Sequence, residues 1–140
     1  MMKIHKPKSV DEIKNTISYL YDCHDGSIRK ICFVKEREVE QNGSLVYPFA
    51  DIRDFINCDV EMELLLNCYP TAKKDQIVLL KFIKTRSFTF MQTEEFDYSD
   101  IYELKFEGEE GRNLLFCFYA TGKKFKALSL SCEKLICVEL

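Results

Sequence analysis

Hydrophobic and polar residues alternate along most of this chain. From Ser27 to Leu140, apolar side chains recur at every second position in several stretches, which is the period of β-strands. The beginning of the chain differs, because apolar residues there recur at steps of three and four. The pattern therefore predicts one helix followed by a β-rich region over residues 27–140.

The helix is expected over about residues 10–21. Ser9 and Glu12 fit a capping box, in which the serine hydroxyl accepts from a free backbone amide and the glutamate reaches back to the cap. The apolar positions that form one stripe are Val10, Ile13, Ile17, Leu20 and Tyr21. We expect the helix to pack on a sheet through this stripe.

The strongest hairpin signal is Asn42-Gly43, because this pair readily adopts the positive backbone angles of a tight turn. A strand from Ile28 toward Glu40 precedes it, and residues 45–47 return before Pro48. Residues 49–57 are expected to form a connection or a short helical turn.

Further strands are expected at residues 58–69, 77–83, 101–106, 114–120, 125–132 and 135–140. The first has Val60, Met62, Leu64 and Leu66 on one face. The stretch 77–83 is apolar on both faces, which is typical of a central or helix-covered strand, and a bent continuation through residues 88–90 fits the pattern. Residues 92–100 are expected to form a loop.

These elements predict a single α+β domain over residues 1–140. Its N-terminal helix packs on a mostly antiparallel β-sheet of about seven strands, which we expect to be curved or partly closed. A sandwich is the alternative that the hydrophobic period leaves open. Because one helix covers only part of a sheet face, the rest must be covered by curvature or by a partner chain.

Composition narrows the class of protein. With 140 residues, 46% of them hydrophobic and 31% charged, the chain is long enough to bury its own core. The net charge of -3 argues against a nucleic-acid partner. We find no apolar stretch long enough for a secretory signal or a membrane span, so we expect a cytoplasmic protein with no membrane partner.

The cysteines are expected to be reduced thiols, mostly in the core. There are seven, at positions 23, 32, 58, 68, 117, 132 and 137, with no C-x-x-C pair. This spacing does not fit a zinc site or a disulfide framework. We expect no metal and no cofactor.

An acidic and aromatic segment is the first candidate site. Glu94, Glu95, Phe96, Asp97 and Tyr98 combine negative charge with two large rings. Such a surface attracts a basic protein partner while its aromatic side chains supply contact area. An ordinary solvated loop is the competing interpretation.

The dipeptide His24-Asp25, with Arg29 close behind it, is the second candidate site. It is compatible with the rim of a pocket that binds or hydrolyses a small molecule, although the simpler interpretation is a junction between helix and strand. Glu61 and Glu63 share one strand face, but such pairs are common on solvated strands. No catalytic residue is predicted, because nucleophile and phosphate-loop motifs are absent.

The run from Tyr21 to Ile31 contains His24-Asp25-Gly26-Ser27-Ile28. It resembles the H-D-x-x-I opening of small bacterial β-rich proteins of uncharacterised function, some of which are encoded as immunity proteins of polymorphic toxin systems. The alternating close of the chain, from Ala127 to Leu140, is similar to their final hairpin. The resemblance implies a structural His-Asp pair and no shared catalytic residue.

Two functional hypotheses follow. The first is a non-enzymatic, immunity-like protein-binding module that uses the acidic and aromatic segment. The second is a pocket protein that uses His24, Asp25 and Arg29. Self-association into a homodimer is compatible with both, since an open sheet has edges to protect.

Overall fold

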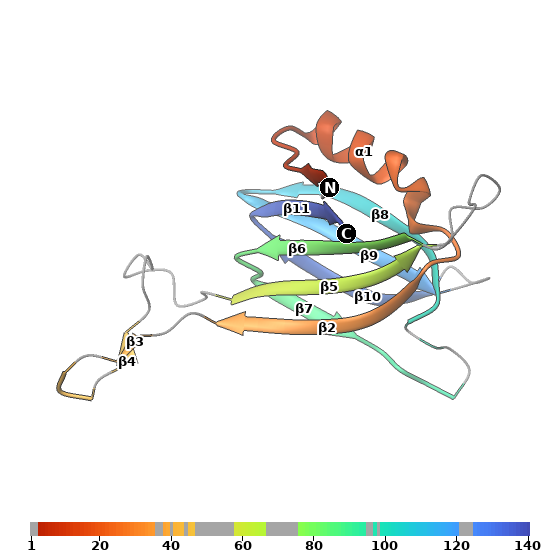
Figure 1. The fold of residues 1–140 in the computed structure, drawn as a ribbon. Coiled ribbons are helices and arrows are strands. Elements are labelled where there is room, and N and C mark those ends of the chain that lie inside the picture. The colour runs from red at the N-terminus through yellow and green to blue at the C-terminus, as the bar shows by residue number, and fades with distance from the viewer. Residues whose placement is uncertain are drawn as a thin grey trace.

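The computed structural model describes residues 3–35, 38–39, 41–43, 45–46, 58–66, 76–94, 97, 99–120 and 125–140 (Figure 1). Its helical elements are α1 (Val10–Tyr19) and the single turn η1 (Tyr21–Cys23). Its strands are β1 (Lys3–His5), β2 (Ser27–Lys35), β3 (Glu38–Val39), β4 (Leu45–Val46), β5 (Cys58–Leu66), β6 (Gln76–Ile83), β7 (Ser87–Phe90), β8 (Ile101–Glu110), β9 (Asn113–Ala120), β10 (Lys126–Cys132) and β11 (Lys134–Glu139). All the strand pairs are antiparallel, which confirms the α+β class.

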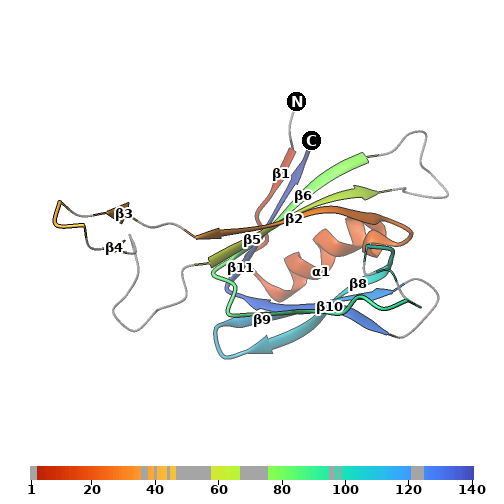
Figure 2. The same cartoon turned by 90° about the horizontal axis from the view of Figure 1, so that it is seen from below.

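The strands form two main sheets, so the prediction of one sheet of about seven strands was wrong in this respect. One sheet has five strands in the order β1-β11-β6-β5-β2, and the other has four in the order β7-β10-β9-β8. The two sheets lie on either side of a shared interior and do not close into a barrel (Figure 2). Buried side chains of both sheets belong to one core, so the second sheet covers apolar surface of the first.

Two sharp bends divide the strands between the sheets. The chain leaves β6 at Lys84, whose φ of 52° is in the left-handed region, and enters β7 in the other sheet. It returns at Glu133, between β10 and β11. The bends lie side by side, since the Glu133 amide donates to the Ile83 carbonyl at 2.9 Å and the Arg86 amide donates to the Ser131 carbonyl at 2.8 Å. The bent continuation through residues 88–90 is thus confirmed as a change of sheet.

The core lies between the sheets and follows the alternation of the sequence. Val60, Met62, Leu64 and Leu66 of β5 are all buried, as predicted. Strand β6 is the third of five in its sheet, which confirms its central position. Across the interior, the rings of Phe82 and Phe116 pack edge to face with centroids 5.4 Å apart.

The helix begins as predicted but ends earlier. The Ser9 hydroxyl accepts from the Glu12 amide at 3.1 Å, while the Glu12 carboxylate accepts from the Lys8 amide at 2.7 Å, one residue before the cap. α1 ends at Tyr19, and Tyr21 does not belong to the buried stripe, because its side chain is 46% exposed. The chain there turns left-handed, with φ of 54° at Tyr21 and 55° at Asp22 and Cys23.

The predicted hairpin at Asn42-Gly43 forms a small sheet of its own. β3 pairs with β4, and Gly43 has a positive φ of 86°. β2 covers Ser27–Lys35 of the predicted strand, and residues 36, 37 and 40 lie outside the described residues. The predicted connection at residues 49–57 lies outside the described residues.

On two sides of the sandwich, an edge strand of one sheet lies beside an edge strand of the other. α1 lies on one of these sides, next to β8, and contributes Ile13, Ile17 and the following Leu20 to the core (Figure 1). The edge strands β2 and β7 border the opposite side.

In the part of the chain that the structure describes, there is no helix with the length and apolar character needed to cross a bilayer.

Candidate functional site

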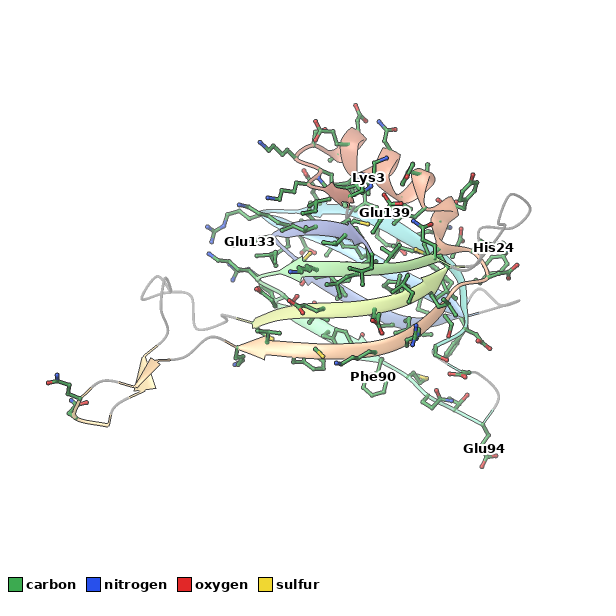
Figure 3. All side chains as sticks on the ribbon, viewed as in Figure 1. Lys3, His24, Phe90, Glu94, Glu133 and Glu139 are labelled. Carbon is green, nitrogen blue, oxygen red and sulfur yellow. The ribbon has the colours of Figure 1, made fainter. Side chains whose placement is uncertain are left out.

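Large apolar side chains gather on the side bordered by β2 and β7. Phe33 is 57% exposed, Phe90 is 58% exposed, and Met91 is 51% exposed. Phe88 connects them, since its ring centroid lies 4.9 Å from that of Phe33 and 6.3 Å from that of Phe90. We call these four residues the apolar edge patch; Phe90 is labelled in Figure 3.

The register explains why phenylalanines are exposed here. Phe33 pairs with the buried Val60, and Phe90 pairs with the buried Leu128, so both lie on the inward faces of their sheets. They are nevertheless exposed because β2 and β7 are edge strands. Single exposed apolar residues are common, whereas a contiguous group of this kind is a candidate interaction surface.

The acidic segment begins directly after this patch. Glu94 and Asp97 are both exposed, and Glu94 projects from the segment that follows β7 (Figure 3). The Asp97 carboxylate accepts from the Ser99 amide at 2.9 Å and from the Ser99 hydroxyl at 2.8 Å, and these bonds lower the pKa of Asp97. The other members of the predicted segment, Glu95, Phe96 and Tyr98, lie outside the described residues.

His24 and Asp25 are adjacent, whereas the side chain of Arg29 is directed toward another partner. His24 Nε2 lies 3.4 Å from Asp25 Oδ2, and both side chains are about half exposed, at 49% and 47%. Arg29 instead points to Glu63, with 4.0 Å between Nε and Oε2. His24, Asp25 and Arg29 are absent from the linings of the cavities that we describe below.

The geometry at His24 is that of a junction between helix and strand. Its Nδ1 lies 2.6 Å from the Tyr102 carbonyl oxygen, which accepts a hydrogen bond when that nitrogen carries the proton. Next to it, the Asp25 amide donates to the Ile101 carbonyl and the Ile101 amide donates to the Gly26 carbonyl, both at 3.0 Å. These bonds attach the start of β8 to the left-handed turn and hold its strained backbone in place.

Glu61 and Glu63 face separate cations rather than each other. Glu61 Oε1 lies 3.9 Å from Lys81 Nζ on β6, and Glu63 is next to Arg29 on β2. Such partly exposed ion pairs favour the solvated-face interpretation over acid-base chemistry.

A polar cluster around Glu139 was not predicted from the sequence. Its carboxylate contacts His5 Nε2 at 2.8 Å and accepts from the Tyr19 hydroxyl at 3.2 Å, and it also accepts from the Gln76 amide. Lys3 Nζ lies 4.8 Å from the Tyr19 ring centroid. The cluster ties β1, α1 and β6 to β11, and it borders an open cavity of about 370 Å³. None of these contacts supplies a nucleophile, so we interpret the cluster as structural.

We expect Glu139→Gln to weaken the fold in a pH-dependent way. Burial raises the pKa of Glu139, but the hydrogen bonds from His5, Gln76 and Tyr19 outweigh it, so the pKa is lowered from 4.5. The stabilisation is therefore fully present above pH 4.5 and is lost as the pH falls through the lower folded-state pKa. The variant should lose about 1–2 kcal/mol at pH 7.

Urea unfolding of wild type and variant at pH 7 and at pH 3 tests this expectation. The difference between the two proteins should be smaller at the lower pH, because protonation of wild-type Glu139 removes the charge that its hydrogen bonds stabilise. Glu110→Gln, on an exposed carboxylate of β8, is the matched control and should show no difference at either pH. A Glu139→Gln difference that is equal at both pH values would contradict the role of the charge.

Four of the cysteines are buried free thiols, as predicted: Cys23, Cys117, Cys132 and Cys137. Burial raises the pKa of Cys132 and Cys137 to about 12. These thiols therefore stay protonated near neutral pH and are poor nucleophiles. Cys32 and Cys58 are partly exposed, and Cys68 lies outside the described residues.

Comparison with known proteins adds no family. No protein-family model, no curated protein and no solved structure matches this chain. Among the described residues, His, Cys, Asp and Glu side chains form no group of three or more that could hold a metal ion. The molecule is thus defined as a two-sheet α+β protein with an apolar patch on its edge strands.

Proposed function

We propose that this chain is a non-enzymatic protein-binding module. Its contact surface is the apolar edge patch together with the exposed carboxylates of Glu94 and Asp97. The observation that carries the proposal is that Phe33 and Phe90, on two edge strands of different sheets, are each more than half exposed.

The patch has the composition of a binding hot spot. Aromatic side chains dominate the energetics of protein interfaces, because they bury a large apolar area with few rotatable bonds. Phe88 holds Phe33 in an edge-to-face contact, so part of the patch is ordered before a partner arrives. A partner that covers these rings removes apolar surface from water, which favours association.

The carboxylates of Glu94 and Asp97 indicate the charge of the partner surface around the apolar edge patch. Glu94 and Asp97 are negative and lie three and six positions after Met91 in the chain. They favour a partner with basic side chains around an apolar centre, and they would increase its association rate at low salt. An immunity-like protein, as the H-D-x-x-I resemblance implies, would bind a single protein partner in this way.

Affinity capture with matched variants tests the proposal. The tagged wild type is compared with Phe33→Ser/Phe90→Ser, with Glu94→Lys/Asp97→Lys, and with the control Ile4→Ser/Leu140→Ser. The control removes two apolar side chains of similar exposure, 54% and 59%. Ile4 lies on the opposite edge strand β1, and Leu140 follows the neighbouring strand β11. We expect one protein that wild type and control retain and that both patch variants lose, with at least about a hundred-fold weaker affinity for the double serine variant.

Two results would contradict the proposal. Equal retention by all four proteins would show that the partner binds elsewhere. Light scattering that shows a dimer of wild type and a monomer of Phe33→Ser/Phe90→Ser would show that a second copy of the chain occupies the patch. Circular dichroism of each variant checks that the fold is unchanged.

A further inference from the structure

A second surface feature lies on the side of the sandwich where α1 packs. A cavity of about 540 Å³ opens where the start of α1, the turn between β8 and β9, and the bend between β10 and β11 meet. This volume is within the range of about 300–1,000 Å³ that is typical of small-molecule sites. The apolar edge patch does not contribute to its lining.

The cavity is lined by an excess of positive charge. Four cationic residues line it: Lys6, Lys8, Arg112 and Lys134. Among the described residues, no carboxylate forms an ion pair with any of these four. Unpaired cations around a concave site favour the binding of an anion.

The two carboxylates of the lining do not balance this charge. Glu133 is already engaged, since Arg86 Nη2 lies 2.9 Å from its Oε1 and Lys84 Nζ lies 3.9 Å from its Oε2. Only Glu109 is left to face the four cations.

The cavity also has an apolar base. Ile13, Leu114 and Leu135 line it and are almost fully buried, with exposures of 2%, 8% and 2%. They come from the helix and from both sheets, so all three layers of the fold shape the cavity. An apolar base with charged groups at one side is the usual arrangement of a site that orients a ligand.

The cationic side chains, and not the helix end, would recognise the anion. The first turn of α1 carries Asp11 and Glu12, and its capping is already satisfied within the chain by Ser9. A further anion placed against the helix end would face these two carboxylates. Arg112 and Lys134 come instead from the turn after β8 and from the start of β11, and not from the helix.

We propose that this cavity binds a small amphipathic carboxylate. Its apolar part contacts Ile13, Leu114 and Leu135, and its carboxylate pairs with Arg112 and Lys134. Arginine forms a planar fork that matches a carboxylate, and charge-assisted hydrogen bonds of this kind are stronger than neutral ones. The site is separate from the apolar edge patch and does not depend on the protein-binding proposal.

An NMR titration tests the proposal with three probes. Octanoate combines both features of the ligand, acetate has only the carboxylate, and 1-octanol has only the apolar chain. We expect octanoate to shift the backbone amides of Ile13, Gly111 and Leu135, and to bind about ten-fold or more tightly than either other probe. Phenylpropionate, in a fourth titration, shows whether the site accepts aromatic as well as aliphatic carboxylates.

Paired variants connect the binding to the named cations. Arg112→Gln/Lys134→Gln should weaken octanoate binding by about ten-fold or more. The control Lys105→Gln/Lys126→Gln removes the same charge from exposed lysines on the other surface of the four-stranded sheet and should leave the affinity unchanged. Three results would overturn the proposal: equal binding of octanol and octanoate, equal weakening by both variants, or shifts centred on Phe33 and Phe90.

Discussion

Replacing Phe82 by alanine is expected to lower the free energy of unfolding by about 3–5 kcal/mol. Phe82 is fully buried at 0% exposure in the central strand β6, and its ring contacts Phe116 of the opposite sheet. The substitution removes apolar contacts and leaves a cavity between the two sheets, which the strand backbones cannot collapse to fill. Because small domains are stable by only about 5–15 kcal/mol, the loss would be a large part of the total.

Urea unfolding of three proteins measures this effect. Phe33→Ala is the matched control, because it deletes the same atoms from a side chain that is 57% exposed. It should cost less than about 1 kcal/mol. Phe82→Leu keeps much of the volume and gives a folded variant if Phe82→Ala proves too unstable to study. Equal losses at positions 33 and 82 would show that the interior of the sandwich is not where the structure places it.

Gly26→Ala is expected to cost about 2–3 kcal/mol, an unusual amount for one added methyl group. A Cβ atom at this position would lie 3.0 Å from the Cys23 carbonyl oxygen and 3.2 Å from the Leu65 carbonyl oxygen. It would also lie 3.0 Å from Leu66 Cδ2. Two of these three atoms belong to the backbone, so the turn or the end of β5 has to move.

The strain at Gly26 should reach the apolar edge patch as well as lower the stability. Gly26 immediately precedes β2, which carries Phe33, and its carbonyl accepts from Ile101 at the start of β8. Gly43→Ala is the control, because an added Cβ has no atom within 4 Å there and the cost comes only from the positive φ of 86°. That cost is about 1 kcal/mol. Thermal unfolding compares the two, and a smaller loss at Gly26 than at Gly43 would contradict the steric argument.

The local elements of this fold were predictable because they depend on neighbouring residues. The capping serine, the helix stripe of Ile13, Ile17 and Leu20, and the buried face of β5 were all predicted from periodicity. The same reasoning predicted the hairpin at Gly43 and the central position of β6. Each conclusion needed only a short window of sequence.

The division into two sheets was not predictable in this way. At Lys84 and Glu133 the strand pattern continues almost without interruption, although the chain changes sheets. A lysine with a positive φ carries no mark in the sequence, since glycine or asparagine is the usual signal of that conformation. Backbone hydrogen bonds between segments about 50 residues apart hold the bends in place, as between Ile83 and Glu133.

The candidate sites were also not predictable from local sequence patterns. Phe33 and Phe90 lie at inward positions like Phe82, so the alternation could not distinguish exposed rings from buried ones. The cluster at Glu139 and the cationic cavity combine residues from the first and last parts of the chain. His24 and Asp25 were singled out because they are neighbours in sequence, yet in the structure they form a junction.

The sequence by itself determined most of the helix and strand segments and their apolar faces, because these properties follow from the period of side chains along a local backbone. The short edge strand β1 (Lys3–His5) was not predicted. Only the tertiary structure decided how the strands divide between two sheets. It also decided which apolar side chains stay exposed at the edges and which charges meet around a cavity. These features depend on contacts between distant segments, and a local pattern carries no information about which distant segments meet.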